Sequence, residues 1–251
     1  MQSHNGTYPK NYNPIRAVFF DLDGTLRHDT PASNQVFFDY AIELGVPDLP
    51  ASRLQALRWS HAYWANVGKM VEQDLAQFER DTSQFWQNYA YRYLLAYGCP
   101  EDQAASLAPQ VRAYMSAHYN PEHTVPADAH PTLMALQEKG YILGIITNRS
   151  RPVHEEVEAL GLTPYFDLIL AAGEVNTFKP DPGIFEHALN QVEVQPQASL
   201  YVGDNYYADI VGAARAGLHP VLIDPDRVFP GVVCPVVDSL SGIQALLNHA
   251  P

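Results

Sequence analysis

The stretch Phe19-Phe20-Asp21-Leu22-Asp23-Gly24-Thr25-Leu26 decides the fold. It follows Ala17-Val18, so a short apolar run ends in two carboxylates and a Gly-Thr turn. An apolar run of this length before a turn is typical of a buried strand. Two acids so close together repel each other unless one is protonated or both find a cation. A lone Asp-x-Asp more often caps a helix or lies in a solvated loop, so the interpretation depends on the rest of the chain.

Three later segments repeat the pattern of a polar group at a turn or strand end. Residues 142–147 form an apolar run that ends in Thr147 and Asn148. Lys179 lies in a proline-rich turn before a helical segment. Residues 200–203 form a third apolar run, followed by Asp204 and, five residues later, Asp209. Because parallel strands collect ligands at their carboxyl ends, these side chains are expected to meet in one pocket with Asp21 and Asp23.

The expected pocket holds four carboxylates and one lysine. They cannot all stay ionised at close range without a counter-ion. Oxygen ligands without His or Cys suit a hard ion, and Mg²⁺ fits a site that also holds phosphate. A nucleophilic carboxylate, a second acid, a hydroxyl and a lysine together indicate phosphoryl transfer.

At this point the chain resembles the haloacid dehalogenase superfamily, in its phosphatase branch. The run Asp21-x-Asp23-Gly24-Thr25 is similar to that family's first motif, and Thr147 with Asn148 to the second. Lys179 matches the third motif, and Asp204 with Asp209 the fourth. The order and separations match as well, over residues of about 16 to 224, although between residues 27 and 124 only length and helical character agree.

The resemblance implies a role for each motif residue. Asp21 is expected to be the nucleophile, Asp23 the general acid and base, and Lys179 the bridge between the phosphoryl group and the nucleophile. Phosphate or substrate is expected to contact Gly24, Thr147, Asn148 and Arg149. Mg²⁺ is expected on Asp21, Asp204 and the backbone carbonyl of Asp23. The resemblance also implies that Asp209 and Asn205 lie behind these ligands. Asp209 could in addition hold Lys179.

The domain organisation follows from where the sheet pattern stops. After residue 26, apolar residues recur at helical spacing for nearly a hundred residues, with Gly45 and Gly98 as helix stops. We therefore expect a loose polar tail over 1–15, a catalytic core over 16–26 and 125–251, and an all-helical cap over 27–124. In the family that the chain resembles, a cap at this place closes over the pocket and selects the substrate.

Beyond residue 141, strand and helix alternate. Strands are expected at 142–147, 168–171, 200–203 and 220–223, and helices at 152–160, 182–189, 208–216 and near 242–247. Such alternation is typical of a parallel sheet with helices on both faces. The predicted fold class is therefore α/β: a Rossmann-like three-layer core with an inserted helical domain.

Composition limits the partners. The 251 residues carry a net charge of −13, which disfavours a nucleic acid or an anionic membrane as partner. No run reaches the ~18 apolar residues of a membrane span, and the first fifteen residues lack a signal-peptide core. The two cysteines, Cys99 and Cys234, are expected to be buried free thiols. The predicted protein is cytoplasmic, a monomer or homodimer, and acts on a small-molecule phosphate ester.

The leading hypothesis is a Mg²⁺-dependent phosphatase that hydrolyses a small organic phosphate monoester through an aspartyl-phosphate. A sugar-phosphate mutase keeps the same motifs and stays open. A metal-independent 2-haloacid dehalogenase is disfavoured because that branch has no acid at the position of Asp23, and a phosphonate hydrolase for the same reason. A non-catalytic binding protein is expected to have lost Asp21, Asp23 or Lys179, and all three are present.

Overall fold

The computed structural model describes residues 14–248 and divides them into two compact units. One unit comprises residues 14–28 and 124–248, and the other, called the cap here, comprises residues 29–123. The predicted insertion, 27–124, differs from the cap by two residues at one end and one at the other. The tail predicted over 1–15 lies, apart from its last two residues, outside the described residues.

The first unit, called the core unit here, is built on a six-stranded parallel sheet, which confirms the predicted α/β class. Its strand order is β5 (Leu168–Ala171), β4 (Ile142–Thr147), β1 (Ala17–Phe20), β6 (Ser199–Gly203), β7 (His219–Ile223) and β8 (Val236–Val237). Every neighbouring pair is parallel. Because β1 lies between β4 and β6, the apolar run that precedes Asp21 lies in the interior of the sheet.

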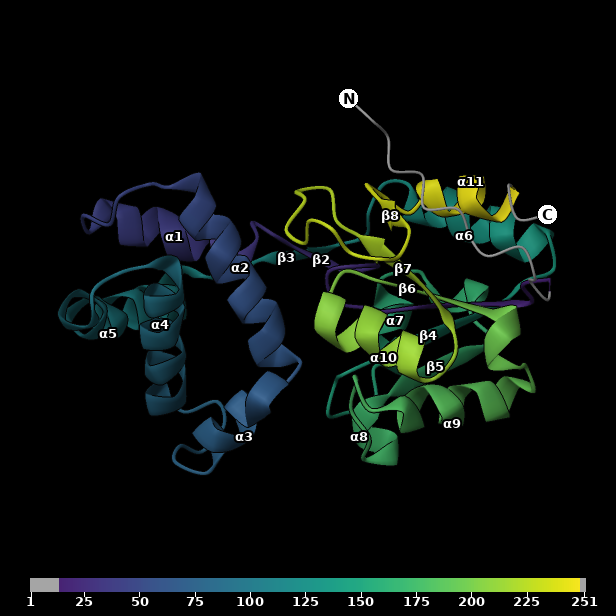
Figure 1. Ribbon diagram of the computed structural model, residues 1–251, viewed down its shortest axis with the longest axis horizontal. Coiled ribbons are helices and arrows are strands. Elements are labelled where there is room, and N and C mark those ends of the chain that lie inside the picture. Colours follow the sequence, from purple (N-terminus) through teal and green to yellow (C-terminus); the bar gives the residue numbers. More distant parts are fainter. Residues whose placement is uncertain (1–13, 249–251) are drawn as a thin grey trace. The chain divides into compact units, whose positions relative to one another are not determined.

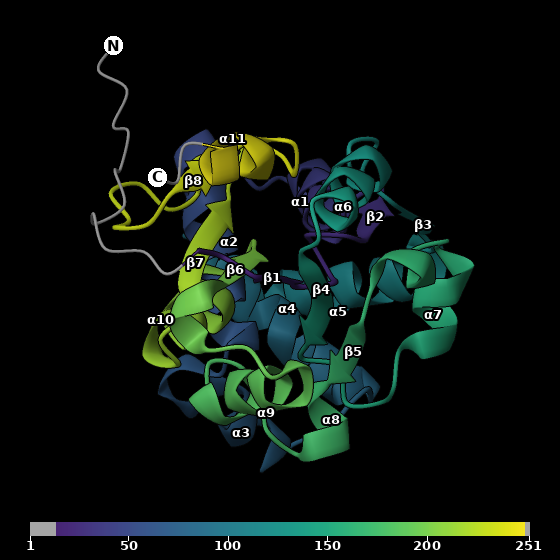
Figure 2. The ribbon, with the colours of Figure 1, turned by 90° about the vertical axis from the view of Figure 1, so that its right-hand side faces the viewer.

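Helices cover both faces of this sheet, as Figures 1 and 2 show. Alternate residues of β1 point to opposite faces: Val18 and Phe20 pack in one apolar cluster, Ala17 and Phe19 in the other. The first cluster includes residues of α6 (Ala129–Glu138), α7 (His154–Ala159) and α11 (Gly242–Asn248). The second includes residues of α8 (Ala172–Val175), α9 (Pro182–Val192) and α10 (Val211–Arg215). Burial on both faces explains why these strands are apolar without alternation.

Some elements of the core unit differ from the expectation. Helices α6 and α8 and the two-residue strand β8 were not predicted. The helix expected over 208–216 begins as a π-helical turn, Tyr206–Ile210, and continues as α10. Asn205 caps this turn, because its side-chain Oδ1 accepts from the backbone amides of Tyr207 and Ala208. The start of the helix is therefore set by the residue that follows Asp204.

The cap is helical. Its elements are α1 (Ser33–Glu43), α2 (Pro50–Trp64), α3 (Met70–Leu75), α4 (Ser83–Tyr97) and α5 (Glu101–His118), of which α3 was not predicted. Thr82 caps α4 by accepting from the amide of Phe85, and Gly98 ends it with φ of 105°. A separate apolar cluster rich in aromatic rings lies between α1, α2, α4 and α5. The cap thus has a hydrophobic core of its own.

A two-stranded ribbon joins the units along the chain. It pairs β2 (His28–Thr30) with β3 (Glu122–Thr124), which are the strands where the chain enters and leaves the cap. Asp29 accepts from the Tyr119 hydroxyl at 3.2 Å and lies 2.9 Å from His123 Nδ1.

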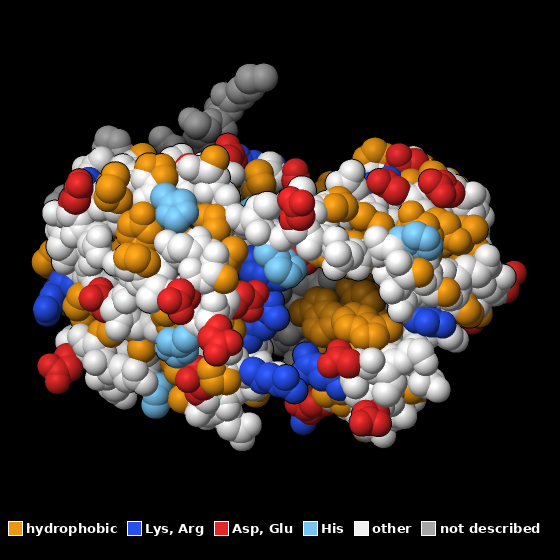
Figure 3. All heavy atoms as spheres, turned by 180° about the vertical axis from the view of Figure 1, so that it is seen from behind, with side chains coloured by type: hydrophobic (Ala, Val, Ile, Leu, Met, Phe, Trp, Pro, Cys, Tyr) orange, Lys and Arg blue, Asp and Glu red, His pale blue; other side chains and the backbone are white. Residues whose placement is uncertain are grey.

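Two surface observations complete the fold. On the face shown in Figure 3, acidic side chains lie scattered over both units. Among the described residues 14–248, no helix has the length and apolar character needed to cross a membrane. Of the two cysteines, Cys99 is buried as expected, whereas Cys234 is only half-buried; both are free thiols.

Candidate active site

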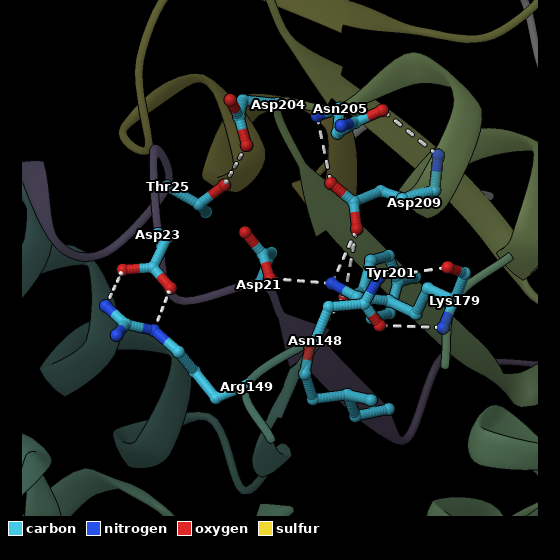
Figure 4. Close-up of polar contacts among 12 residues, drawn as sticks. Asp21, Asp23, Thr25, Asn148, Arg149, Lys179, Tyr201, Asp204, Asn205 and Asp209 are labelled. Carbon is cyan, nitrogen blue, oxygen red and sulfur yellow. Dashed lines mark hydrogen bonds and ion pairs between the residues drawn. The ribbon is translucent and has the colours of Figure 1, made fainter. Parts of the chain in front are cut away.

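The polar residues predicted from the sequence meet at the carboxyl edge of the sheet, within the core unit. Asp21 directly follows β1, Thr147 ends β4, and Asp204 directly follows β6. Figure 4 shows the carboxylates of Asp21, Asp204 and Asp209 converging on one space. One oxygen of each lies within 4.8 Å of the others.

Lys179 is the buried centre of this cluster. Its ammonium group donates to Asp21 Oδ1 at 2.6 Å, to Asp209 Oδ1 at 2.7 Å and to the Tyr201 hydroxyl at 2.8 Å. The Lys179 side chain is only 2% exposed. An ammonium has three protons, so all three are used. Burial alone disfavours the charged lysine, but the two carboxylates outweigh it and hold its pKa above the usual value.

The backbone of Lys179 is held by Asn148. The side-chain Oδ1 of Asn148 accepts from the Lys179 amide at 2.7 Å, and its Nδ2 donates to the Lys179 carbonyl at 2.9 Å. Asp181 caps α9 by accepting from the Gly183 amide, so the turn that carries Lys179 runs directly into a helix. Both ends of the Asn148 side-chain amide therefore bind the peptide groups of Lys179, and the expected contact of Asn148 with phosphate stays a prediction.

Asp21 and Asp204 are strongly perturbed carboxylates. Burial raises the pKa of Asp21 to about 7, with the Lys179 charge opposing it and Asp209 and Asp23 adding to it. Burial, with the charges of Asp21 and Asp209, also raises the pKa of Asp204 well above the usual value. Two acids that cannot easily ionise together are the arrangement that a divalent cation relieves.

Asp23 has the opposite environment. Arg149 donates to it through Nε at 2.6 Å and Nη2 at 2.7 Å, and Arg27 donates to it through Nη1 at 2.5 Å. Glu156 lies 2.8 Å from Arg27 Nε, so the arginine pair has a second acidic partner. Burial favours the neutral form of Asp23, but hydrogen bonds and charges from Arg149 and then Arg27 hold its pKa below the usual value. Arg149, predicted to contact substrate, here contacts the predicted general acid.

Gly24 has a geometric part in the site. Its φ is +87°, and a Cβ at this position would collide with the carboxylate of Asp204. Its amide donates to the Arg27 carbonyl at 2.8 Å, inside the turn. Gly24 therefore leaves room for the Asp204 carboxylate, and its expected contact with phosphate stays a prediction.

Asp209 and Asn205 lie behind the carboxylate pair, as expected. Asp209 Oδ2 accepts from the Asn205 amide at 2.9 Å, while its other oxygen binds Lys179. Asn205 uses its side chain to cap the following turn. Thr25 Oγ1 lies 3.4 Å from Asp204 Oδ1. Thr147 is buried at the end of β4.

Two residues of this cluster, Arg27 and Tyr201, were not predicted from the sequence. Arg27 was read as the start of the segment leading to the cap, but its side chain is buried against Asp23. Tyr201 was read as one residue of an apolar strand, yet its hydroxyl bonds Lys179. An arginine four residues after Asp23, beside a predicted acidic site, was a usable signal for the first. No signal near Tyr201 in the sequence indicates its partner.

Comparisons with known proteins agree with this geometry. A family model described as haloacid dehalogenase-like hydrolase matches residues 15–217. The ribulose-1,5-bisphosphate 5-phosphatase of Halopiger xanaduensis is 34% identical over 217 residues, covering 84% of this chain and 85% of that protein. The glyceraldehyde 3-phosphate phosphatase of Pyrococcus furiosus is 30% identical over 214 residues, covering 82% and 80%.

Among solved structures, a 2-haloacid dehalogenase from Pseudomonas syringae is similar, with a TM-score of 0.53 and 26% identity, covering 94% of this chain and all of that one. A family match over most of the chain and relatives of this identity show the same membership that the motifs indicated. The chain therefore belongs to the haloacid dehalogenase-like hydrolases, in the phosphatase branch of that family.

Proposed function

We propose that the protein hydrolyses small organic phosphate monoesters, with Mg²⁺, through an aspartyl-phosphate on Asp21. The observation that carries the proposal is the Asp21 carboxylate itself. One of its oxygens is held by Lys179 at 2.6 Å, and it lies in the same cluster as Asp204 and beside Asp23. A carboxylate fixed on one side by a buried ammonium has its other oxygen available for attack or for a metal ion.

The residues present fit a magnesium ion. Asp21 and Asp204 supply oxygen ligands only, the Asp21 charge raises the pKa of Asp204, and Gly24 leaves room for the Asp204 carboxylate. We assign the ion to Asp21, Asp204 and the Asp23 carbonyl. Asp209 is not assigned to it, because its oxygens accept from Lys179 and from the Asn205 amide. When bound, Mg²⁺ would offset the charge of the carboxylates and of the phosphoryl oxygens.

The protein's own residues carry two displacements at phosphorus. In the first, an Asp21 oxygen bonds to phosphorus, the bond from phosphorus to the leaving oxygen breaks, and Asp23 gives that oxygen its proton. In the second, a water oxygen bonds to phosphorus, Asp23 takes the water's proton, and the bond to Asp21 breaks. Lys179 stays beside Asp21, and the proton that it directs at Asp21 is shared with a phosphoryl oxygen, which Thr147 also contacts.

Asp23 can act as an acid only after its hydrogen bonds with Arg149 are broken. In the structure both Asp23 oxygens accept from Arg149, which favours the ionised form. We propose that an anionic group of the arriving substrate draws Arg149 away from Asp23. The pKa of Asp23 then rises, so that Asp23 can carry the proton that it donates. Arg149 is the side chain of this group best placed for such an exchange, since it is 40% exposed whereas Arg27 is 9% exposed.

The relatives indicate the kind of substrate. Those named above act on ribulose-1,5-bisphosphate and glyceraldehyde 3-phosphate, and a further relative, from Thermus thermophilus, is a phosphoserine phosphatase. We propose a phosphate ester of a small polar metabolite. Nucleic acid and membrane are not proposed as partners, and oligomeric state and location stay predictions from the sequence.

The test is turnover of the full chain on a panel of such esters, with Mg²⁺ and with excess chelator. Aryl phosphate is the reference substrate, and Asp21→Asn, which replaces the nucleophile by an amide, is the background control. We expect phosphate release that needs Mg²⁺ and is lost in the variant. Release that persists in chelator, or in Asp21→Asn checked for deamidation, would contradict the proposal.

The same assay separates the alternative functions. A sugar-phosphate mutase would convert its substrate to an isomer with little phosphate release, so sugar phosphates are assayed for both products. The similar dehalogenase structure makes 2-haloacids a worthwhile second panel. Asp23 argues against that reaction, because a leaving halide needs no proton. Halide release without metal would favour it instead.

A further inference from the structure

Tyr201 is a buried tyrosine whose hydroxyl lies among charged groups. It lies in the middle of β6, and its side chain is inaccessible to solvent. Its ring packs edge-on against Phe185 of α9, with centroids 5.0 Å apart. Phenylalanine would satisfy these ring contacts equally well, so packing alone does not explain the hydroxyl.

The hydrogen bonds of this hydroxyl have a defined direction. It has one proton, and its nearest acceptors are the Ile146 carbonyl at 2.9 Å and Asp209 Oδ1 at 3.3 Å. The shorter contact takes the proton. Lys179 donates to the hydroxyl oxygen at 2.8 Å, so a lone pair faces the ammonium. Figure 4 shows Tyr201 beside Lys179 and Asp209, with Asp21 on the other side of the ammonium.

The hydroxyl also connects two parts of the site. Ile146 directly precedes Thr147 on β4, and its carbonyl accepts the hydrogen bond that the tyrosine hydroxyl donates. Through one oxygen atom, the strand end that carries Thr147 is therefore tied to the ammonium of Lys179. The two carboxylates fix the ammonium by charge, and the neutral hydroxyl is its third acceptor, which sets its rotation about the last side-chain bond.

We propose that Tyr201 is a positioning residue: its hydroxyl, held by the Ile146 carbonyl, orients the Lys179 ammonium for the phosphoryl group. The inference rests on the proposed function, in which Lys179 contacts both Asp21 and the phosphoryl oxygens. A small misplacement of a charged group near the reacting atoms is costly to rate, about 100-fold for about 1 Å. A merely structural role would lower stability and leave turnover by the folded protein intact.

The experiment compares three changes in the full chain, assayed on an aryl phosphate with Mg²⁺. Tyr201→Phe removes the hydroxyl. Replacing Tyr201 by p-aminophenylalanine keeps a donor for the Ile146 carbonyl but offers the lysine a poor acceptor. The matched control is Tyr97→Phe in the cap, because the Tyr97 hydroxyl is also buried and bridges two backbone groups, the Pro47 carbonyl and the Leu49 amide.

We expect both changes at Tyr201 to lower kcat by about 10- to 100-fold, with a much smaller change in KM, and the control to keep its kcat. The aminophenylalanine variant keeps the fold even where Tyr201→Phe does not, because its bond to β4 survives. Recovery of wild-type kcat in that variant overturns the inference.

A double-mutant cycle adds a second readout. In a Lys179→Met background, Tyr201→Phe is expected to cause no further loss of residual kcat, because the group that the hydroxyl orients is gone. Equal losses in both backgrounds overturn the inference. Failure of the unaltered protein to hydrolyse any monoester sinks the proposed function, and the inference falls with it. If the unaltered protein hydrolyses the ester and Tyr201→Phe has the same kcat, the inference is wrong but the proposed function stands.

Discussion

At the scale of single residues, the two acids of the first motif are perturbed in opposite directions. Burial raises the pKa of Asp21 to about 7, whereas Arg149 and Arg27 overcome burial at Asp23 and lower its pKa. The proposed roles need the reverse, an ionised nucleophile and a protonated acid. In the proposed function, binding of metal and substrate would therefore have to lower the pKa of Asp21 and raise that of Asp23.

We expect Asp23→Asn to spare esters with good leaving groups. A poor leaving alkoxide needs a proton from Asp23, whereas an aryl oxide needs it less. The loss of kcat should be about 100-fold or more on alkyl phosphates and clearly smaller on aryl phosphates. The measurement is kcat for a series of esters of increasing leaving-group pKa. A uniform loss along the series would mean that Asp23 is mainly structural.

Asp21 also predicts how the metal-free protein responds to pH. Its folded pKa of about 7 lies above the unfolded value of 3.8, so between these values the folded state holds a proton that the unfolded state has lost. Stability from this group is complete below 3.8 and is lost as pH rises toward 7. In chelator at pH 8, Asp21→Asn should therefore melt several degrees higher than the unaltered protein, since about 1 kcal/mol shifts Tm by about 2–4 °C at this size.

That advantage should shrink as the pH is lowered to 4, where Asp21 is neutral in the folded state and partly protonated in the unfolded state, and also when Mg²⁺ is added at pH 8. Thermal melts at both pH values, with and without metal, provide the check. Asp226→Asn, at an exposed loop position, is the control for a change of net charge. An Asp21→Asn variant that is less stable at pH 8 in chelator would contradict the pKa assignment.

At the scale of elements, turns and strand ends decide where the charges lie. Gly24 and Gly203 are both placed where a Cβ would collide with a carboxylate, that of Asp204 and Asp209 respectively. The turn after β1 therefore depends on a residue of β6's loop, although the two segments are far apart in the chain. A side chain added in either turn would therefore displace a carboxylate of the acidic cluster.

We expect Gly24→Ala to weaken Mg²⁺ binding and turnover by displacing Asp204. Its φ of +87° makes alanine strained there in any case, so a control for strain is needed. Gly140→Ala is that control: it has φ of +81° in the same unit, with no atom within 4 Å of the added Cβ. Both variants should lose stability, but only Gly24→Ala should raise the Mg²⁺ concentration needed for half-maximal rate. Equal metal dependence would contradict the steric argument.

The elements also show what the sequence could predict. The strands of the core are apolar runs that end in polar motif residues, so β1, β4 and β6 were predictable from local pattern. Helix α6 was missed, although Ala129, Leu133 and Leu136 are buried at helical spacing. Strand β8 has two residues, too few for any pattern. Tyr201 could not be recognised, because its meaning depends on Lys179, which reaches it only in the folded sheet.

At the scale of the whole molecule, the residues of the candidate active site and the helical insertion belong to different units. Every motif residue lies in the core unit, and the cap has its own apolar cluster. We expect a variant lacking residues 32–119, with the ribbon ends joined by a short flexible linker, to keep weak hydrolysis of an aryl phosphate. Its selectivity among natural esters should collapse, because the cap is the unit that we expect to exclude water and to contact the substrate.

The check is the rank order of substrates for the shortened and the full protein. The shortened protein must first be shown to be folded, by a cooperative thermal melt. If it is folded and ranks substrates as the full protein does, specificity lies in the core unit, with Arg149 the first residue to test.

The central position of β1 has a consequence for synthesis on the ribosome. This strand leaves the exit tunnel before its neighbours β4 and β6, which begin at Ile142 and Ser199. The helical insertion has mostly local contacts and is translated in between, so it can fold while β1 still waits for partners. The nascent chain therefore has to keep an apolar strand from aggregating until β4 and then β6 have been translated.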